Sequence, residues 1–144
     1  EKFGDYERLS GKREAFGKEK KENYILRKFL YPAEFTEILA SSDIVIARGG
    51  INTVYEIYLL NRPAFVIPIP FSQREEQLNN ANFLKNQGLA EVAQQEDIDP
   101  NIFLEKILHM IANIKTYKRK PSGLAFRDAS IKIIKILKEC ADEK

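Results

Sequence analysis

The sequence lacks most of the residue types on which metal centres and covalent catalysis depend. It contains one cysteine, Cys140, one histidine, His109, and no tryptophan among 144 residues. A single cysteine excludes an internal disulfide and a cysteine-based zinc site, and a single histidine excludes a histidine cluster. The histidine also falls in the middle of an expected helix, which argues against a Ser/His/Asp triad. We therefore expect no metal ion and no cofactor.

Long apolar runs are also missing, because no stretch approaches the roughly 18 residues of a membrane-spanning helix. Residues 1–22 are charged and contain no apolar segment of the signal-peptide type. The near absence of cysteine fits a reducing compartment. We therefore expect a cytoplasmic protein.

Charge is distributed unevenly along the chain, although the net charge is only +2. Lys and Arg exceed Asp and Glu by three in residues 1–30 and by five in residues 114–144, whereas Asp and Glu are in excess by six in residues 31–113. Basic ends suit anionic lipid headgroups, which indicates contact with the inner face of a membrane. The other interpretation is that Lys and Arg solvate exposed helices. No nucleic-acid-binding motif is present, so we expect no nucleic-acid partner.

Short apolar runs alternate with amphipathic stretches from residue 24 onwards. The runs are rich in β-branched residues, as in a buried parallel sheet, and the stretches between them have helical spacing. This alternation predicts an α/β fold, a Rossmann-like parallel sheet flanked by helices. The expected strands are 24–30, 43–47, 64–69 and 89–93, and the expected helices are 33–40, 53–60, 75–87, one that starts at Pro100 after an Asp99 cap, and 124–140.

The same pattern divides the chain into three parts. Residues 1–22 have no clean period, so we predict a charged, flexible segment without regular structure. Residues 23–113 hold the alternating strands and helices, and residues 114–144 form a basic linker and the last helix. Ligands of parallel α/β sheets bind outside the carboxyl ends of the strands. The loops that follow the first three expected strands are therefore the candidate site.

The loop after the second expected strand reads Arg48-Gly49-Gly50-Ile51-Asn52-Thr53. Two glycines let the backbone approach a ligand closely, and the following helix directs free N–H groups and the positive end of its dipole at the loop. Such a loop suits a diphosphate. An ordinary strand-to-helix turn is the alternative interpretation.

Acidic and amide side chains follow in the next two helices. Glu56 lies three residues after Thr53, so the pair forms a capping box in one interpretation, and in the other Glu56 binds the two hydroxyls of a ribose. Glu76 and Gln77 start a helix and offer acceptors and donors to sugar hydroxyls; for the carboxylate, complementing the helix dipole is the alternative. Asn80 is either a surface residue or a hydrogen-bonding anchor.

In their order and spacing, these loops resemble the C-terminal, nucleotide-sugar-binding half of the family 28 (MurG-type) glycosyltransferases of the GT-B superfamily. The resemblance extends over about residues 24–140, and no gap is needed between Asp43 and Ala81. The family has His or Gln at the position of Glu76, and the opening strand of its C-terminal half has no counterpart here. The motifs that carry the resemblance are Ser42-Asp43-Ile-Val-Ile-Ala-Arg48-Gly-Gly50-Ile-Asn-Thr53-Val-Tyr-Glu56, Asn61-Arg62-Pro63, Val66-Ile-Pro68 and Glu76-Gln77-Leu-Asn-Asn80-Ala81.

The resemblance implies a hexosyltransferase whose donor substrate is a UDP-sugar, with N-acetylglucosamine as the expected sugar. It implies that the glycine pair and Thr53 face the diphosphate, that Glu56 holds the ribose, and that Glu76 and Gln77 read the sugar hydroxyls. The donor-binding residues that it implies are Arg48, Gly49, Gly50, Asn52, Thr53, Glu56, Glu76, Gln77 and Asn80, with Leu30, Tyr31 and Pro32 bordering the base. No metal is implied.

The resemblance also implies that this chain is part of a larger enzyme or one subunit of a split one. The acceptor-binding half has no counterpart in the sequence, and the catalytic base would come from it. The implied partners are a nucleotide-sugar, the missing acceptor-binding domain or subunit and, since the acceptor can be lipid-linked, a membrane surface. Two other functions stay open: a nucleotide-sugar epimerase of the same fold, and a non-catalytic partner domain.

Overall fold

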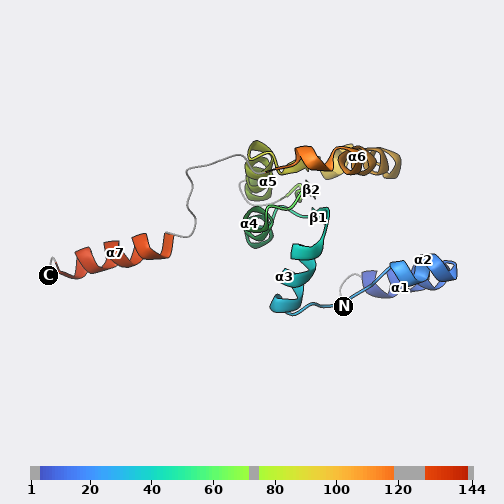
Figure 1. Ribbon diagram of the computed structural model, residues 1–144, viewed down its shortest axis with the longest axis horizontal. Coiled ribbons are helices and arrows are strands. Elements are labelled where there is room, and N and C mark those ends of the chain that lie inside the picture. Colours follow the sequence, from blue (N-terminus) through green and yellow to red (C-terminus); the bar gives the residue numbers. More distant parts are fainter. Residues whose placement is uncertain (1–3, 72–74, 119–128, 143–144) are drawn as a thin grey trace. The chain divides into compact units, whose positions relative to one another are not determined.

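The computed structural model describes residues 4–71, 75–118 and 129–142 (Figure 1). The chain divides into two compact units, Glu1–Ser41 and Ser42–Lys144. The main elements are α1 (Asp5–Glu14), α2 (Lys18–Asn23), α3 (Pro32–Ser41), β1 (Val45–Ala47), α4 (Ile51–Leu60), β2 (Ala64–Val66), α5 (Glu76–Asn86), β3 (Ala90–Val92), α6 (Pro100–Ala112) and α7 (Ala129–Asp142), with short 3₁₀ helices at Gln95–Asp97 and Ile114–Thr116.

The first unit differs from the sequence-based prediction in two places. Residues 1–22 were expected to lack regular structure, but they contain most of α1 and α2. Helix α1 has acidic residues in its first turn, basic residues in its last turn and no buried residue. The charges at its two ends therefore complement the helix dipole, and the helix has no apolar stripe that would reveal it by periodicity. The aromatic rings of Phe16 and Tyr24 meet edge to face at 5.6 Å, and the guanidinium of Arg13 donates to the Tyr24 carbonyl at 2.7 Å.

The predicted strand at residues 24–30 is wrong, because these residues have no regular secondary structure. A strand requires hydrogen-bonded neighbours, and within the described residues this segment has no ladder partner. Helix α3 confirms the helix expected at 33–40, and Pro32 is its first residue, where a missing N–H costs nothing.

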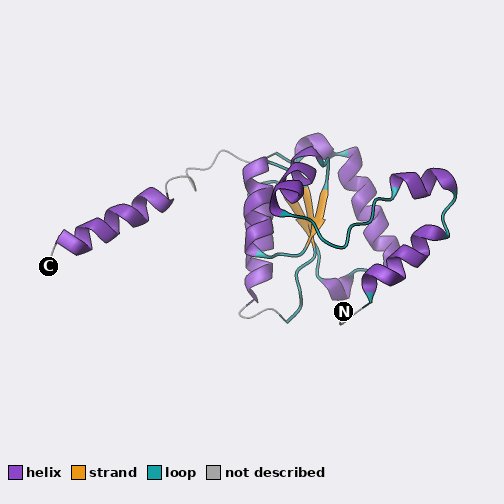
Figure 2. Ribbon diagram, turned by 90° about the horizontal axis from the view of Figure 1, so that it is seen from below, coloured by secondary structure: helices purple, strands orange, loops and turns teal. Residues whose placement is uncertain are grey.

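The second unit is built on a three-stranded parallel sheet in the order β1-β2-β3. The central strand β2 is wholly buried, and its Ala64 is in register with Val45 of β1 and Ala90 of β3. Figure 2 shows the strands surrounded by helices of the unit. The strands expected at 43–47, 64–69 and 89–93 are thus confirmed in place, although each is shorter than expected. The predicted α/β fold with a Rossmann-like parallel sheet is confirmed.

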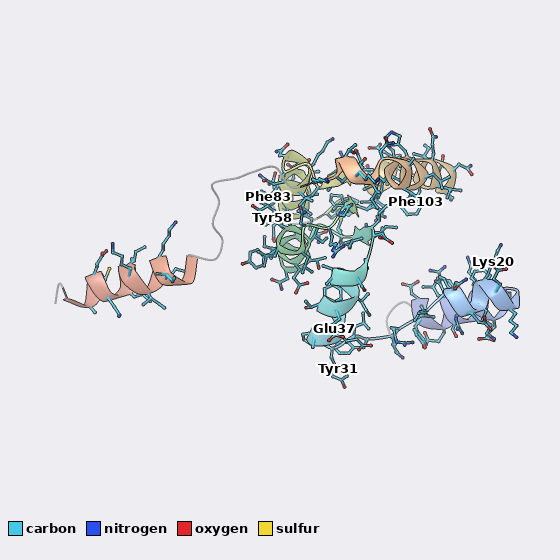
Figure 3. All side chains as sticks on the ribbon, viewed as in Figure 1. Lys20, Tyr31, Glu37, Tyr58, Phe83 and Phe103 are labelled. Carbon is cyan, nitrogen blue, oxygen red and sulfur yellow. The ribbon has the colours of Figure 1, made fainter. Side chains whose placement is uncertain are left out.

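Helices α4 and α5 pack against one another, and α6 packs on β2. Figure 3 marks Tyr58 of α4 beside Phe83 of α5, with ring centroids 5.2 Å apart, and Phe103 of α6, whose ring meets Phe65 of β2 edge to face at 5.6 Å. The buried core consists of Val54, Ile57, Tyr58, Ala64, Phe65, Val66, Ala81, Leu84, Leu89, Ala90 and Met110 of this unit. The aromatic pairs and the buried aliphatic residues fix α4 and α5 relative to the sheet edge that carries the candidate site.

Two helix ends follow the predicted chemistry. The Asp99 carboxylate accepts from the N–H groups of Asn101 and Ile102 at 2.7 and 3.0 Å, which confirms it as the cap of α6. Gly88 follows the end of α5 with φ +78°, and the N–H groups of Gly88 and Leu89 bond back to the last turn of α5. This is the left-handed glycine ending that is common at the C-termini of helices.

Helix α7 confirms the helix expected near the end of the chain over Ala129–Asp142, while residues 124–128 of that prediction lie outside the described residues. Among the described helices, none combines the length and apolarity that crossing a bilayer requires. The domain boundaries predicted after residues 22 and 113 stay a prediction, and the structure places its own division at Ser41/Ser42.

Candidate functional site

The carboxyl end of β1 leads directly into an uncapped helix. Gly50 is the N-cap of α4, with φ −66° and ψ 137°, and no side chain of the described residues caps the helix. The first intrahelical bond runs from the Val54 N–H to the Gly50 carbonyl at 3.0 Å. The N–H groups of Ile51, Asn52 and Thr53 therefore precede the i→i−4 ladder, and the first turn contains no acidic residue. This arrangement is a ready site for an anion.

The helix start removes one of the two interpretations of Glu56. Thr53 is the third residue of α4 and not its N-cap, so the capping box proposed from Thr53 and Glu56 does not form. The Glu56 side chain is half-buried, and within the described residues its carboxylate has no hydrogen-bond or ion-pair partner. A carboxylate in this state, one turn into the helix that carries the anion site, is available to ligand hydroxyls.

The two glycines of the loop have different surroundings. Gly49 is buried, and a Cβ at this position would lie 2.8 Å from the carbonyl carbon of Gln77, closer still to its carbonyl oxygen, and 3.0 Å from its Cα. A Cβ at Gly50 would meet nothing within 4 Å. Gly49 thus allows the backbone of α5 to approach the loop, and Gly50 is the glycine that leaves space for a ligand.

Three predicted site residues bond to the backbone at this edge of the sheet. The Asn80 side-chain amide donates to the Gly49 carbonyl at 3.0 Å, the Gln77 side-chain carbonyl accepts from the Ile69 N–H at 3.1 Å, and Arg48 donates to the Ile67 carbonyl at 3.1 Å. Asn80 is therefore a hydrogen-bonding anchor. The Asn80 and Gln77 bonds join the first turns of α5 to the ends of β1 and β2, and the Arg48 bond joins the ends of β1 and β2 to each other.

Glu76 and Asn52 have exposed side chains at the starts of their helices. Glu76 is the first residue of α5, after an N-cap, Glu75, with a left-handed φ of +56°, and residues 72–74 of the preceding loop lie outside the described residues. The structure therefore brings together the glycine pair, the first turn of α4, Gln77 and Asn80, with Glu76 next to Gln77 in the chain.

The predicted base-binding loop belongs to the first unit. Pro32 is the first residue of α3, the carbonyl of Tyr31 accepts from the Phe35 N–H at 2.9 Å, and the Tyr31 ring, 73% exposed, meets Phe29 edge to face at 5.5 Å. Leu30 is half-buried. The role of this loop in binding stays a prediction.

Sequence reasoning overlooked backbone groups that the site uses. It assigned the helix start to Thr53, whereas the N–H of Ile51 is the first of the free amides. It also gave no role to two backbone groups at the end of β2. The Ile67 carbonyl accepts a hydrogen bond from Arg48, and the Ile69 N–H donates one to the Gln77 side chain. The backbone angles of Gly50 in the structure identify it as the N-cap of α4. The sequence alone shows a Gly-Gly pair, which does not specify which glycine is the cap.

Parallel strands, short loops and a helix start at the carboxyl edge are the arrangement at which open α/β sheets bind their ligands. Residues 3–133 match the glycosyltransferase family 28 C-terminal domain, and the chain belongs to this family. The predicted family is therefore confirmed.

Full-length relatives carry one shared name, UDP-N-acetylglucosamine--N-acetylmuramyl-(pentapeptide) pyrophosphoryl-undecaprenol N-acetylglucosamine transferase. The protein of Clostridium kluyveri is 33% identical over 107 residues, which are 74% of this chain and 30% of the relative. The protein of Staphylococcus aureus strain JH9 is 32% identical over 132 residues, which are 86% of this chain and 37% of the relative. The chain thus spans about a third of the length of these relatives.

Proposed function

We propose that this chain is the donor-binding part of a glycosyltransferase that moves N-acetylglucosamine from UDP-N-acetylglucosamine to a hydroxyl of a lipid-linked acceptor, with inversion. The observation that carries the proposal is the uncapped start of α4, held beside α5 at the carboxyl edge of the sheet. Family membership and the names of the relatives support the reaction class, the donor and the acceptor type.

The diphosphate, the ribose and the sugar of the donor each have a counterpart at this edge. The diphosphate lies against Gly50 and the N–H groups of Ile51, Asn52 and Thr53, where the helix dipole favours negative charge. The free carboxylate of Glu56 accepts from the ribose hydroxyls. The side chain of Glu76 faces the sugar.

Catalysis in this part of the enzyme is stabilisation of the leaving group. As the bond from the sugar to the diphosphate breaks, negative charge grows on the phosphate oxygens next to the first turn of α4. Fixed amide dipoles stabilise that charge without reorganising, and the guanidinium of Arg48 at the same edge adds a positive charge. The group that removes the acceptor proton belongs to the acceptor-binding part, in the same protein or another subunit.

The proposal is tested by titrating the chain with UDP-N-acetylglucosamine in calorimetry and thermal unfolding. We expect binding and a rise in the unfolding temperature. Glu56→Gln should weaken binding about tenfold or more, because the lost carboxylate bonds are charge-assisted, and it should leave the unliganded unfolding temperature unchanged. Glu105→Gln, at an exposed position of α6, is the matched control and should do neither.

Two outcomes separate the alternatives. Conversion of UDP-N-acetylglucosamine to its 2-epimer without any acceptor, followed by NMR, would favour the epimerase. If the unaltered chain binds no nucleotide-sugar, the donor-binding proposal is wrong and the non-catalytic partner domain replaces it.

We also propose that the enzyme acts at the cytoplasmic face of a membrane and that α7 contributes to this contact. Ile133, Ile134, Ile136 and Leu137 are more than half exposed, and three lysines share the helix with them. An apolar face with basic neighbours suits an anionic interface, and the acceptor in the relatives' names carries undecaprenol. Co-sedimentation with phosphatidylglycerol vesicles but not phosphatidylcholine vesicles is expected, and equal recovery with both would exclude this contact.

A further inference from the structure

The side chain of Asn80 forms a hydrogen bond with the backbone of a loop that is distant in sequence. It lies one turn into α5, and its side-chain amide donates to the carbonyl of Gly49, 31 residues earlier, at 3.0 Å in a partly buried position. This hydrogen bond joins an α5 side chain to the loop between β1 and α4. This bond uses one N–H group of the amide and ties the side chain to the backbone of the loop.

The Cα of Gly49 is also in close contact with α5. Because Gly49 has no Cβ, the backbone of Gln77 fits directly against it. The Gln77 side chain, one turn before Asn80, accepts from the Ile69 N–H at 3.1 Å and thereby ties α5 to the end of β2. The first two turns of α5 therefore hold Gly49 in two ways, by the backbone contact of Gln77 and by the hydrogen bond from Asn80.

Fixing a carbonyl fixes the next N–H group. In a trans peptide the C=O and N–H bonds point in opposite directions, and the structure contains no cis peptide among the described residues. With the Gly49 carbonyl directed at Asn80, the Gly50 N–H points away from α5, and it is followed by the three N–H groups of the first turn of α4. The orientation of this row of donors thus depends on the bond that Asn80 makes.

We infer that Asn80 is a positioning residue for the diphosphate cradle. Its amide holds the Gly49–Gly50 peptide so that the donors at the start of α4 face the nucleotide. This inference rests on the proposed donor-binding function. It predicts that loss of the Asn80 amide weakens binding of the whole nucleotide, UDP as much as UDP-N-acetylglucosamine, because the sugar plays no part in the contact.

The experiment compares two ligands on two pairs of variants. Asn80→Ala removes the donor, and Asn80→Asp keeps the shape but directs a carboxylate at the Gly49 carbonyl. Asn82→Ala and Asn82→Asp change an exposed amide of the same helix and serve as matched controls. Dissociation constants for UDP and for UDP-N-acetylglucosamine are measured by calorimetry at a temperature where circular dichroism shows every variant folded.

We expect both Asn80 variants to raise the two dissociation constants by the same factor, about tenfold, while the Asn82 variants leave both unchanged. A loss confined to UDP-N-acetylglucosamine would show that Asn80 contacts the sugar and would overturn the inference. Unchanged affinities would overturn it as well.

Failure of the donor-binding proposal has a different signature. In that case the unaltered chain binds neither ligand, and the positioning role is read from amide hydrogen exchange of the unliganded chain. Asn80→Asp should then speed exchange at Gly50 and in the first turn of α4, and Asn82→Asp should not. Equal exchange in the two variants would refute the positioning role irrespective of any ligand.

Discussion

The two glycines at the end of β1 provide a matched pair of substitutions with opposite consequences. In Gly49→Ala the new methyl group would lie 2.8 Å from the Gln77 carbonyl carbon and 3.0 Å from its Cα. Ordinary contacts of this kind are at about 3.5–4.0 Å, so α5 has to move by roughly half an ångström or more. The obstacle is backbone in a packed helix pair, and overpacking of this kind costs about 1–3 kcal/mol.

Gly50→Ala places its methyl group in open space, at a φ of −66° that alanine adopts without strain. We expect only a small loss of stability from exchanging glycine for alanine at an N-cap, within about 1 kcal/mol. The same methyl group occupies space that we assign to the diphosphate. Gly50→Ala should therefore weaken UDP binding strongly in a chain that unfolds almost normally.

The assay is thermal and urea unfolding of both variants, followed by UDP titration of the folded chains. For a chain of this size, 1–3 kcal/mol corresponds to a fall of roughly 3–12 °C in the unfolding temperature of Gly49→Ala. If Gly49→Ala unfolds like the unaltered chain, the close approach of α5 to the loop is wrong. If Gly50→Ala binds UDP normally, the diphosphate does not lie at this glycine.

Two further predictions concern groups outside the site. Gly88→Ala forces alanine to a φ of +78° after α5 and should lower the free energy of unfolding by about 1–2 kcal/mol, seen in urea unfolding. Burial, and then the bond from the Tyr117 hydroxyl to Glu91 at 3.0 Å, raise the pKa of Tyr117 to about 12. The folded chain therefore retains a proton that the unfolded chain loses, so this stabilisation is complete below about pH 10 and disappears as the pH rises towards 12. Absorbance titration of the phenols should show the latest ionising tyrosine missing in Tyr117→Phe, and an unchanged curve would contradict the shift.

The sequence predicts the second unit well because its signals are local. Buried strands read as short apolar runs, α6 has an aspartate cap followed by proline, and α5 ends at a glycine. The strand expected at residues 24–30 fails for a non-local reason, since an apolar run becomes a strand only when a neighbour supplies hydrogen bonds. Helix α1 was missed because its signal lies in charges at its ends and not in apolar periodicity.

The site shows the same limit at the level of single residues. The family resemblance placed Gly49, Gln77 and Asn80 in one site, and the structure brings them together. Spacing did not predict that the Asn80 amide is engaged by a carbonyl 31 residues away, nor that Gln77 bonds to the backbone of Ile69. Such bonds depend on how two helices meet at a sheet edge, which no local pattern encodes.

These bonds leave Glu76 as the side chain best placed to distinguish sugars, and this makes a final prediction. Its carboxylate is exposed at the start of α5, next to a Gln77 whose side-chain carbonyl is occupied by the backbone. A carboxylate only accepts hydrogen bonds, so it fits sugar hydroxyls that donate, and such bonds to a charged group are stronger than neutral ones. Glu76→Gln should therefore raise the dissociation constant of UDP-N-acetylglucosamine about tenfold and leave that of UDP unchanged, the opposite of the pattern expected for Asn80. Glu105→Gln is the control. If Glu76→Gln weakens UDP equally, Glu76 acts on the nucleotide or on the start of α5, and the sugar is selected elsewhere.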